Sequence, residues 1–186
     1  LEFRRVLFRS LAGLVNNAGI VVAGPLELLP MAELRRQFEV NVLGMLAVTQ
    51  AFLPLLRAGR GRIVNVTSGN GFLSLAYFGS YSASKFAQHA LSDALRQELR
   101  HWGIPVSMVA PGCVATPIWG KSFDAAERLA RQVSPERYEQ YHEDLDAVRA
   151  AARHLAETAG PVERVAKAVC RALVARRPKA LYIVGF

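Results

Sequence analysis

Cysteine is scarce in this chain of 186 residues, which contains only Cys113 and Cys170. Two cysteines cannot build a disulfide framework, so a reducing compartment is expected, and each most simply fills a small packing position. The four histidines are scattered without the spacing of metal ligands. The sequence therefore predicts no metal site.

Long hydrophobic runs are also missing. No stretch reaches the roughly 18 consecutive apolar residues of a membrane-spanning helix. The arginines of the opening segment, "LEFRRVLFRS", interrupt any signal-peptide apolar region. We therefore expect neither a membrane partner nor a secretion signal, and the cytoplasm is the expected location.

Acidic residues are outnumbered, since 23 Lys and Arg residues face 15 Asp and Glu residues. The basic residues are spread along the chain, and no recognised nucleic-acid motif accompanies them. Nucleic acid is therefore not an expected partner, although a basic surface would attract an anionic cofactor. The hydrophobic fraction of 52% indicates a folded protein with a real core, and the length suits one domain.

Helices and strands alternate in the predicted secondary structure. Four short apolar runs predict buried strands, and three long periodic segments between them predict helices. Strand, helix, strand, helix is typical of an α/β fold with an open parallel sheet covered on both faces. Pro54 is expected to bend or end the first helix, and Gly103 to stop the second. The strands are expected at residues 11–15, 62–66, 105–110 and 180–184, and the helices at about 31–56, 80–102 and 162–175.

A polar, mostly helical segment at residues 117–160 interrupts this alternation after the third strand. Insertions after a strand end usually form a lid or a binding loop. Its aromatic residues could line a substrate wall or form core, and the sequence favours neither: they are Trp119, Phe123, Tyr138 and Tyr141.

Three predicted strands end in polar residues followed by glycine: "NNAG" at 16–19, "TSG" at 67–69 and "PG" at 111–112. In a parallel sheet, the carboxyl ends of the strands lie along one edge, where doubly wound folds bind ligands. The three endings are therefore expected to converge on one crevice.

Tyr81 and Lys85 are four residues apart at the start of the second helix, so they share a helical face. A free phenol has a pKa near 10, and a nearby positive charge favours the phenolate. A tuned phenol can exchange a proton with an alcohol or carbonyl oxygen. Ser68 ends a neighbouring strand and could hold that oxygen. Asn41 is a poor helix former within a helix, which makes more sense if it holds a water.

Each of these residues also has a purely structural interpretation. Tyr81 and Lys85 could be an ordinary solvated pair, and Ser68 could be a turn former or a helix cap. Asn41 could face solvent, and "NNAG" could be a tight turn because Asn and Gly tolerate positive φ. The sequence alone leaves these alternatives open.

Five segments together resemble the short-chain dehydrogenase/reductase family: "LVNNAGI", "FEVNVLGMLAVTQAFLPLL", "GRIVNVTS", "YSASK" and "VAPGCVATP". Their order and spacing are similar to the family from about residue 11 to residue 116, and the helix and strand after Pro161 also fit. The resemblance implies a Rossmann-like doubly wound parallel sheet. It also implies an oxidoreductase that passes hydride between NAD or NADP and a small-molecule alcohol/ketone substrate.

The resemblance implies a catalytic set of Asn41, Ser68, Tyr81 and Lys85. Tyr81 would be the acid–base, and Ser68 would position the substrate oxygen. Lys85 would lower the pKa of Tyr81 and bind ribose hydroxyls, so both residues would also contact the cofactor. Asn41 would support a proton-relay water.

The resemblance also implies cofactor contacts at two strand ends. Asn17, Ala18 and Gly19 would lie near the adenosine ribose. The nicotinamide end would be held by Pro111, Gly112, Val114 and Thr116. The two long helices resemble those that form dimer or tetramer interfaces, so a homodimer or homotetramer is expected at full length.

The Gly-rich "TGxxxGxG" turn of the family has no counterpart before Asn16. We therefore expect a Rossmann-like fold lacking its first three strand–helix units, and an inactive fragment that binds NAD(P) weakly. Residues 1–10 are expected to be a non-native leader, residues 11–186 the C-terminal portion of one domain, and 117–160 its substrate-loop insertion.

Two functions are weighed. The first is the oxidoreductase, with a lipophilic substrate of steroid, retinoid or fatty-acyl type suggested by the apolar and aromatic residues after Thr116. The second is a non-catalytic interaction or dimerisation module that retains the fold. The intact set of Asn, Ser, Tyr and Lys favours the first.

Overall fold

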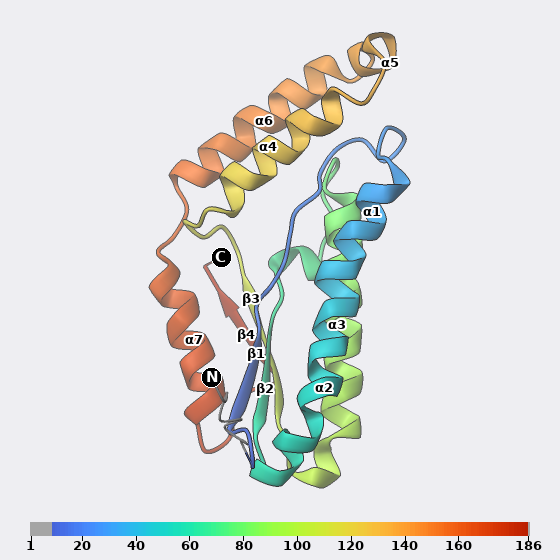
Figure 1. Ribbon diagram of the computed structural model, residues 1–186. Coiled ribbons are helices and arrows are strands. Elements are labelled where there is room, and N and C mark those ends of the chain that lie inside the picture. The colour runs from blue at the N-terminus through green and yellow to red at the C-terminus, as the bar shows by residue number, and fades with distance from the viewer. Residues whose placement is uncertain (1–8, 186) are drawn as a thin grey trace, which may run out of the picture.

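A parallel four-stranded sheet forms the centre of the computed structural model, which describes residues 9–185 (Figure 1). The strands lie side by side in chain order. Asn16 pairs with Asn65, and Val66 pairs with Val109, so three carboxyl ends meet at one edge. The predicted parallel α/β fold is confirmed. The strands are β1 (Gly13–Asn16), β2 (Arg62–Val66), β3 (Val106–Pro111) and β4 (Leu181–Val184).

Two long helical segments cover one face of the sheet, and α7 (Val162–Val174) covers the other (Figure 1). The first segment runs without a break through α1 (Met31–Phe38), a π-helical turn (Glu39–Leu43) and α2 (Gly44–Gly59). Pro54 lies inside α2, so of its two expected effects, ending the helix is wrong. The second segment is α3 (Gly79–Glu98), followed by a short 3₁₀ turn that stops at Gly103 in the left-handed conformation (φ 67°), as expected.

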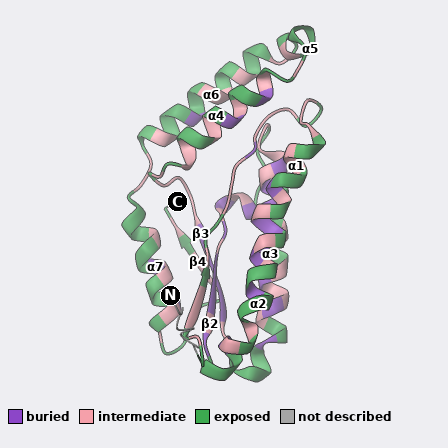
Figure 2. Cartoon of the chain, in the orientation of Figure 1, coloured by how far each residue is buried: buried purple, intermediate pink, exposed green. Residues whose placement is uncertain are grey.

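Each face of the sheet has its own apolar core. Towards α2 and α3, the fully buried Leu56 and Ile63 pack with Leu95, Leu99, Ile104 and Val106. Towards α7, Val64 and Val109 pack with Ala168 and Ala172. Successive residues of a strand point to opposite faces, so Ile63 and Val64 serve different cores. The buried residues accordingly follow the sheet and the inner sides of its helices (Figure 2).

Residues 117–160 form a helical lid beyond the carboxyl ends of the strands (Figure 1). It consists of α4 (Ile118–Ala130), α5 (Pro135–Glu139) and α6 (His142–Glu157). Polar contacts fasten it to the loops below: the Tyr141 hydroxyl donates to Glu27 at 2.6 Å, Arg137 pairs with the same carboxylate at 3.3 Å, and the Tyr77 hydroxyl donates to Asp144 at 2.6 Å. The excursion predicted from sequence is therefore helical and lies above the expected crevice.

The continuous helix Met31–Gly59 is long and apolar enough, by length and composition alone, to cross a membrane. Leu56 of this helix is fully buried in the core beside the sheet, and Leu46 and Leu53 pack against the same core. A core helix passes the same test, so the absence of a membrane partner stays a prediction. The expectation that residues 1–10 are a foreign leader falls mostly on residues outside the described range.

Candidate active site

Asn41 lies on the π-helical turn between α1 and α2 and is fully buried. Its interpretation as a solvent-facing residue is therefore wrong. Its side chain holds three hydrogen bonds: Oδ1 accepts from the Ile20 main-chain N–H, and Nδ2 donates to the Ile20 carbonyl and to Ser84 Oγ. π-Helical turns are rare and often occur at functional sites. Here the turn points an amide at the loop that follows "NNAG".

Tyr81 and Lys85 lie in the first two turns of α3, as the spacing predicts. The Lys85 Nζ is 5.6 Å from the centre of the Tyr81 ring, and the lysine is buried. This excludes a solvated surface pair, because burial of an ammonium is costly unless a structural or functional reason compensates it. The pair therefore belongs to the crevice.

Ser68 follows β2 and precedes the 3₁₀ turn Gly69–Gly71. Its Oγ accepts a hydrogen bond from the Asn70 main-chain N–H at 3.2 Å, so the interpretation as a cap is correct. That bond uses an acceptor lone pair and not the hydroxyl proton, which can still be donated. Asn70 Nδ2 donates to Ser82 Oγ at 3.3 Å and fastens this loop to α3. Ser68 can thus be a cap and a donor at once.

His89 supports the same loop from below. It is buried on α3, its Nε2 lies 2.9 Å from Thr67 Oγ1, and its ring packs edge-on against Phe72. Burial lowers the pKa of His89, Asp93 opposes this, and the nearby Lys85 adds to it. Gly71 passes so close to the His89 ring that a Cβ would overlap it. The loop that carries Ser68 therefore packs closely against the His89 ring.

Burial changes the acid–base properties of the pair. It raises the pKa of Tyr81, while the hydrogen bond with Ser68 lowers it. It also lowers the pKa of Lys85 to about 8. The direction for Tyr81 is opposite to the one expected from a neighbouring lysine, because taking the phenolate out of water outweighs the Ser68 bond. The expectation that Lys85 lowers the pKa of Tyr81 is therefore wrong, because desolvation of the phenolate raises that pKa.

The residues expected to hold a cofactor reach the same crevice from two sides. A Cβ placed on Gly19 would lie 3.5 Å from Asn41 Oδ1 and 3.7 Å from Lys85 Nζ, so this glycine backbone lies against both side chains. Asn17 and Ala18 are exposed beside it. This arrangement leaves the Lys85 ammonium next to the loop expected to contact a ribose.

Main-chain groups of the segment after β3 make the hydrogen bonds that hold it in place. The Gly112 N–H donates to the Val184 carbonyl at 2.8 Å, and the Trp119 Nε1 donates to the Val114 carbonyl at 2.9 Å. Pro111 ends β3, and Thr116 lies just before α4. These four expected contact residues therefore follow the strand into the lid, although Trp119 is used as an anchor rather than a wall.

Basic side chains surround a cavity of mixed polarity beside Gly19. The cavity is lined by the loop 19–21, Arg36 of α1 and one side of α4, which presents Lys121, Asp124 and Arg128. Arg36 also pairs with Glu33 at 2.7 Å. Cations outnumber anions around this cavity, so it suits an anionic group of a cofactor or substrate.

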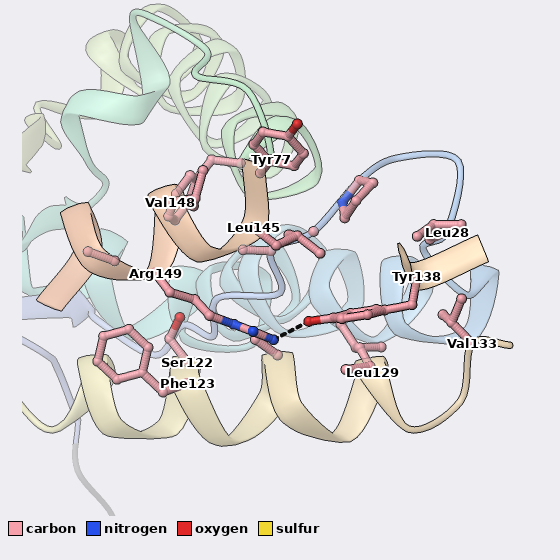
Figure 3. Close-up of a pocket in the computed structure, with 17 residues that line it drawn as sticks. Leu28, Tyr77, Ser122, Phe123, Leu129, Val133, Tyr138, Leu145, Val148 and Arg149 are labelled. Atoms are coloured by element: carbon pink, nitrogen blue, oxygen red, sulfur yellow. Dashed lines mark hydrogen bonds between the residues drawn. The ribbon is translucent and has the colours of Figure 1, made fainter. Parts of the chain in front are cut away.

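An apolar cavity lies between the lid and the loops below it (Figure 3). Phe123 and Leu129 of α4 form one side, and Leu145 and Val148 of α6 form another. Arg149 reaches across to the Tyr138 hydroxyl, to which it donates a hydrogen bond. Phe123 and Tyr138 are thus wall residues, and Tyr141 instead bonds to Glu27. Two of the four aromatic residues therefore line a cavity, while Trp119 and Tyr141 make hydrogen bonds to other segments.

One buried residue of this site was missed from the sequence. Gln88 lies between Lys85 and the π-helical turn, where its Oε1 accepts a hydrogen bond from Lys85 Nζ at 2.8 Å. The signal was present, because Tyr81, Lys85, Gln88 and Ser92 recur at helical spacing on one face of α3. This polar stripe runs beside the apolar stripe that predicts the helix.

Comparison with known proteins gives a consistent family. Residues 2–127 match the family described as short chain dehydrogenase. The NADPH-dependent 3-dehydrocapnine reductase of Ornithobacterium rhinotracheale is 36% identical over 182 residues, which cover 95% of this chain and 62% of that protein. Retinol dehydrogenase 7 of Mus musculus is 37% identical over 186 residues, which cover 98% of this chain and 58% of that protein.

A solved structure agrees. The short chain dehydrogenase/reductase of Burkholderia phymatum, in complex with NAD, superposes with a TM-score of 0.75 at 27% identity. The match covers 92% of this chain and 61% of that chain. The chain therefore spans about three fifths of the length of these relatives.

Proposed function

Because this chain belongs to the short-chain dehydrogenase/reductase family, we propose that it carries the chemistry of an NAD(P)-dependent oxidoreductase acting on an alcohol/ketone pair. The observation that carries the proposal is the meeting of Tyr81, Ser68 and Lys85 at the carboxyl edge of the sheet. The relatives support the cofactor class, since one is named NADPH-dependent and another is solved with NAD.

The chain's own residues would handle the proton. Tyr81 would give its phenolic proton to a carbonyl oxygen, or take one from an alcohol through its phenolate. Ser68 would donate its hydroxyl proton to the same oxygen and hold it next to Tyr81. The cofactor, when bound, supplies or accepts the hydride. Burial keeps Tyr81 protonated at neutral pH, which is the form required to protonate a carbonyl oxygen.

Lys85 fits a nicotinamide cofactor through its position. Its ammonium lies beside the Gly19 backbone and can donate to a ribose hydroxyl at that loop. The basic cavity around Arg36, Lys121 and Arg128 adjoins Gly19 and would favour an anionic group. Both features depend on residues of this chain.

A lipophilic substrate is the second part of the proposal. The cavity under the lid is lined mainly by apolar side chains and lies next to Tyr77 and Phe78, directly before α3. Apolar cavities with a few polar groups are typical of small-molecule sites. One relative is named a retinol dehydrogenase, which agrees with a substrate of steroid, retinoid or fatty-acyl type.

The test is reduction of a series of ketones with NADH and NADPH, followed by loss of reduced cofactor. Tyr81→Phe should lower kcat by about 100-fold or more, because it removes the proton donor and keeps the ring. Because the relatives are longer than this chain, the assay uses the protein extended to their full length, and calorimetry first establishes cofactor binding. Bound cofactor without turnover of any carbonyl would contradict the proposal.

A non-catalytic association function is the second candidate. Val48 and Phe52 of α2 and Phe86 of α3 are each more than 40% exposed, although all three are large and apolar. An exposed apolar surface of this kind suits a second copy of the chain, as expected for a homodimer or homotetramer. Association without any cofactor binding would favour this candidate. We also propose that the protein is located in the cytoplasm, whichever of the two functions it has.

A further inference from the structure

Gln88 links two parts of the candidate active site. Its side chain is 1% exposed on α3 and uses both ends of its amide. The Oε1 accepts a hydrogen bond from Lys85 Nζ at 2.8 Å, and the Nε2 donates to the Asn41 main-chain carbonyl. A single side chain therefore connects the lysine to the π-helical turn.

The position of Gln88 is itself fixed from the sheet. The Ser92 hydroxyl donates to the Gln88 main-chain carbonyl at 2.6 Å, and Asn65 Nδ2 of β2 donates to Ser92 Oγ at 2.8 Å. Asn16 of β1 in turn donates to Asn65 Oδ1 at 2.9 Å. The main chain at Gln88 is therefore the end of a buried polar network that starts in the central strands, and such a network restricts its members to one geometry.

The amide occupies a place with a chemical role. The resemblance implies that Lys85 and Asn41 belong to one catalytic set, and the Gln88 amide makes hydrogen bonds to both. A carboxamide holds an ammonium as well as a water does, but it cannot readily pass a proton from one side to the other. The bridge therefore serves to hold the lysine rather than to conduct protons.

The surroundings of Lys85 contain few other charges. Tyr81 and His89 are the titratable groups nearest to it on α3, with Asp93 one turn further along. Among the described residues that pack against it, the loop at Gly19 and the turn at Asn41 present amides and carbonyls. Glu39 belongs to the same turn but is exposed. The Gln88 oxygen is thus a principal polar contact of the buried ammonium.

We propose that Gln88 is a positioning residue that holds the Lys85 ammonium beside Tyr81 by bridging it to the Asn41 carbonyl. The catalytic consequence rests on the proposed function, whereas the effect on Lys85 does not. An apolar residue of similar length would fill the same space without anchoring the lysine.

The first experiment measures the protonation of Lys85 by NMR of the 186-residue chain labelled at the lysine side chains, with Lys85→Arg used for assignment. Gln88→Met keeps the length but removes the acceptor, so the pKa of Lys85 should fall by about one unit below about 8. Gln88→Glu places a carboxylate at the same site, so the pKa should rise instead.

The matched control is Gln97→Met, on the exposed side of the same helix, which should leave the pKa of Lys85 unchanged. Opposite shifts in the two Gln88 variants are not expected from a residue that only fills space. If Gln88→Met fails to fold, Gln88→Glu alone carries the test. An unchanged pKa of Lys85 in the folded variants would overturn the proposal.

The second experiment measures the pH dependence of kcat for the cofactor-loaded enzyme. In Gln88→Met, kcat should fall about tenfold, and the alkaline limb should move to lower pH together with the Lys85 pKa. In Gln88→Glu, the limb should move to higher pH. Shifts of the NMR pKa without activity in any form would contradict the proposed function and leave the placement of Lys85 by Gln88 intact. A kcat profile identical to wild type would overturn the catalytic role.

Discussion

The side chain of Asn41 satisfies both main-chain polar groups of Ile20. Its Oδ1 accepts from the Ile20 N–H at 2.8 Å, and its Nδ2 donates to the Ile20 carbonyl at 3.0 Å. The same Nδ2 also donates to Ser84 Oγ of α3 at 3.0 Å. One buried amide therefore joins the loop after β1 to two helices, which explains why a poor helix former is placed in a long helix.

Replacement of this amide should loosen the loop. Asn41→Ala removes three hydrogen bonds and leaves buried polar groups of Ile20 unpaired, so the free energy of unfolding should fall by about 2–4 kcal/mol. Urea denaturation measures this change. Gln50→Ala on the exposed side of α2 is the control and should change it by less than about 0.5 kcal/mol. Equal effects of the two substitutions would contradict the role of Asn41.

The lowered pKa of Lys85 predicts a pH dependence of stability. The unfolded lysine binds its proton up to about pH 10.5, whereas the folded lysine releases it near pH 8. Between these values the unfolded state binds more protons, so stability should rise with pH, by about 2–3 kcal/mol between pH 8 and pH 10. Below about pH 8, Lys85 adds no slope.

Urea denaturation of wild type and Lys85→Met across this range measures the effect. Lys85→Met should lose the rise, and Lys121→Met, an exposed lysine of α4, should keep it. Tyr81 limits the window, because its raised pKa destabilises the fold once the unfolded phenol ionises above about pH 10. A wild-type stability that does not increase before that limit would count against the buried lysine.

The contact between Gly71 and His89 predicts a size-dependent defect. Gly71→Ala places a methyl group against the imidazole, so the loop that carries Ser68 must shift, and stability should fall by about 1–3 kcal/mol. Combining it with His89→Ala should recover part of this loss by making room. Gly120→Ala in α4 meets nothing within 4 Å and should be neutral or stabilising by about 1 kcal/mol. Thermal unfolding of the three variants distinguishes these outcomes.

The apolar cavity predicts a dependence on substrate size. Phe123→Ala removes a wall residue, so kcat/KM for long-chain ketones should fall about tenfold while that for short ketones changes little. Leu155→Ala on the exposed side of α6 is the control and should leave both values unchanged. A uniform loss for all ketones would mean that Phe123 supports the lid rather than the substrate.

The exposed apolar residues of α2 and α3 predict self-association. Phe52→Lys, at a position 41% exposed, should shift the sedimentation coefficient towards the monomer with little loss of helix content. Val174→Lys at the end of α7 replaces an even more exposed apolar side chain and should not change the assembly. A wild-type chain that is monomeric at high concentration would contradict this interface.

Local sequence patterns were sufficient to predict where the strands lie. The predicted strand at 62–66 matches β2 at both ends, and the other three strands were placed to within two residues. Period and apolar run length are properties of a short segment, so they survive without knowledge of the fold. The helix through Pro54 shows the limit of prediction from local patterns. Leu53 and Leu56 pack in the core, and this tertiary packing continues a helix that the proline alone would discourage.

The amino-acid sequence by itself determined the α/β order, the polar strand ends and the shared helical face of Tyr81 and Lys85. Only the tertiary structure decided that Gln88 joins Lys85 to Asn41, that Phe123 faces a cavity, and that burial raises the pKa of Tyr81. The reason is physical: periodicity depends on neighbours along the chain, whereas desolvation and hydrogen-bond partners depend on segments that folding brings together.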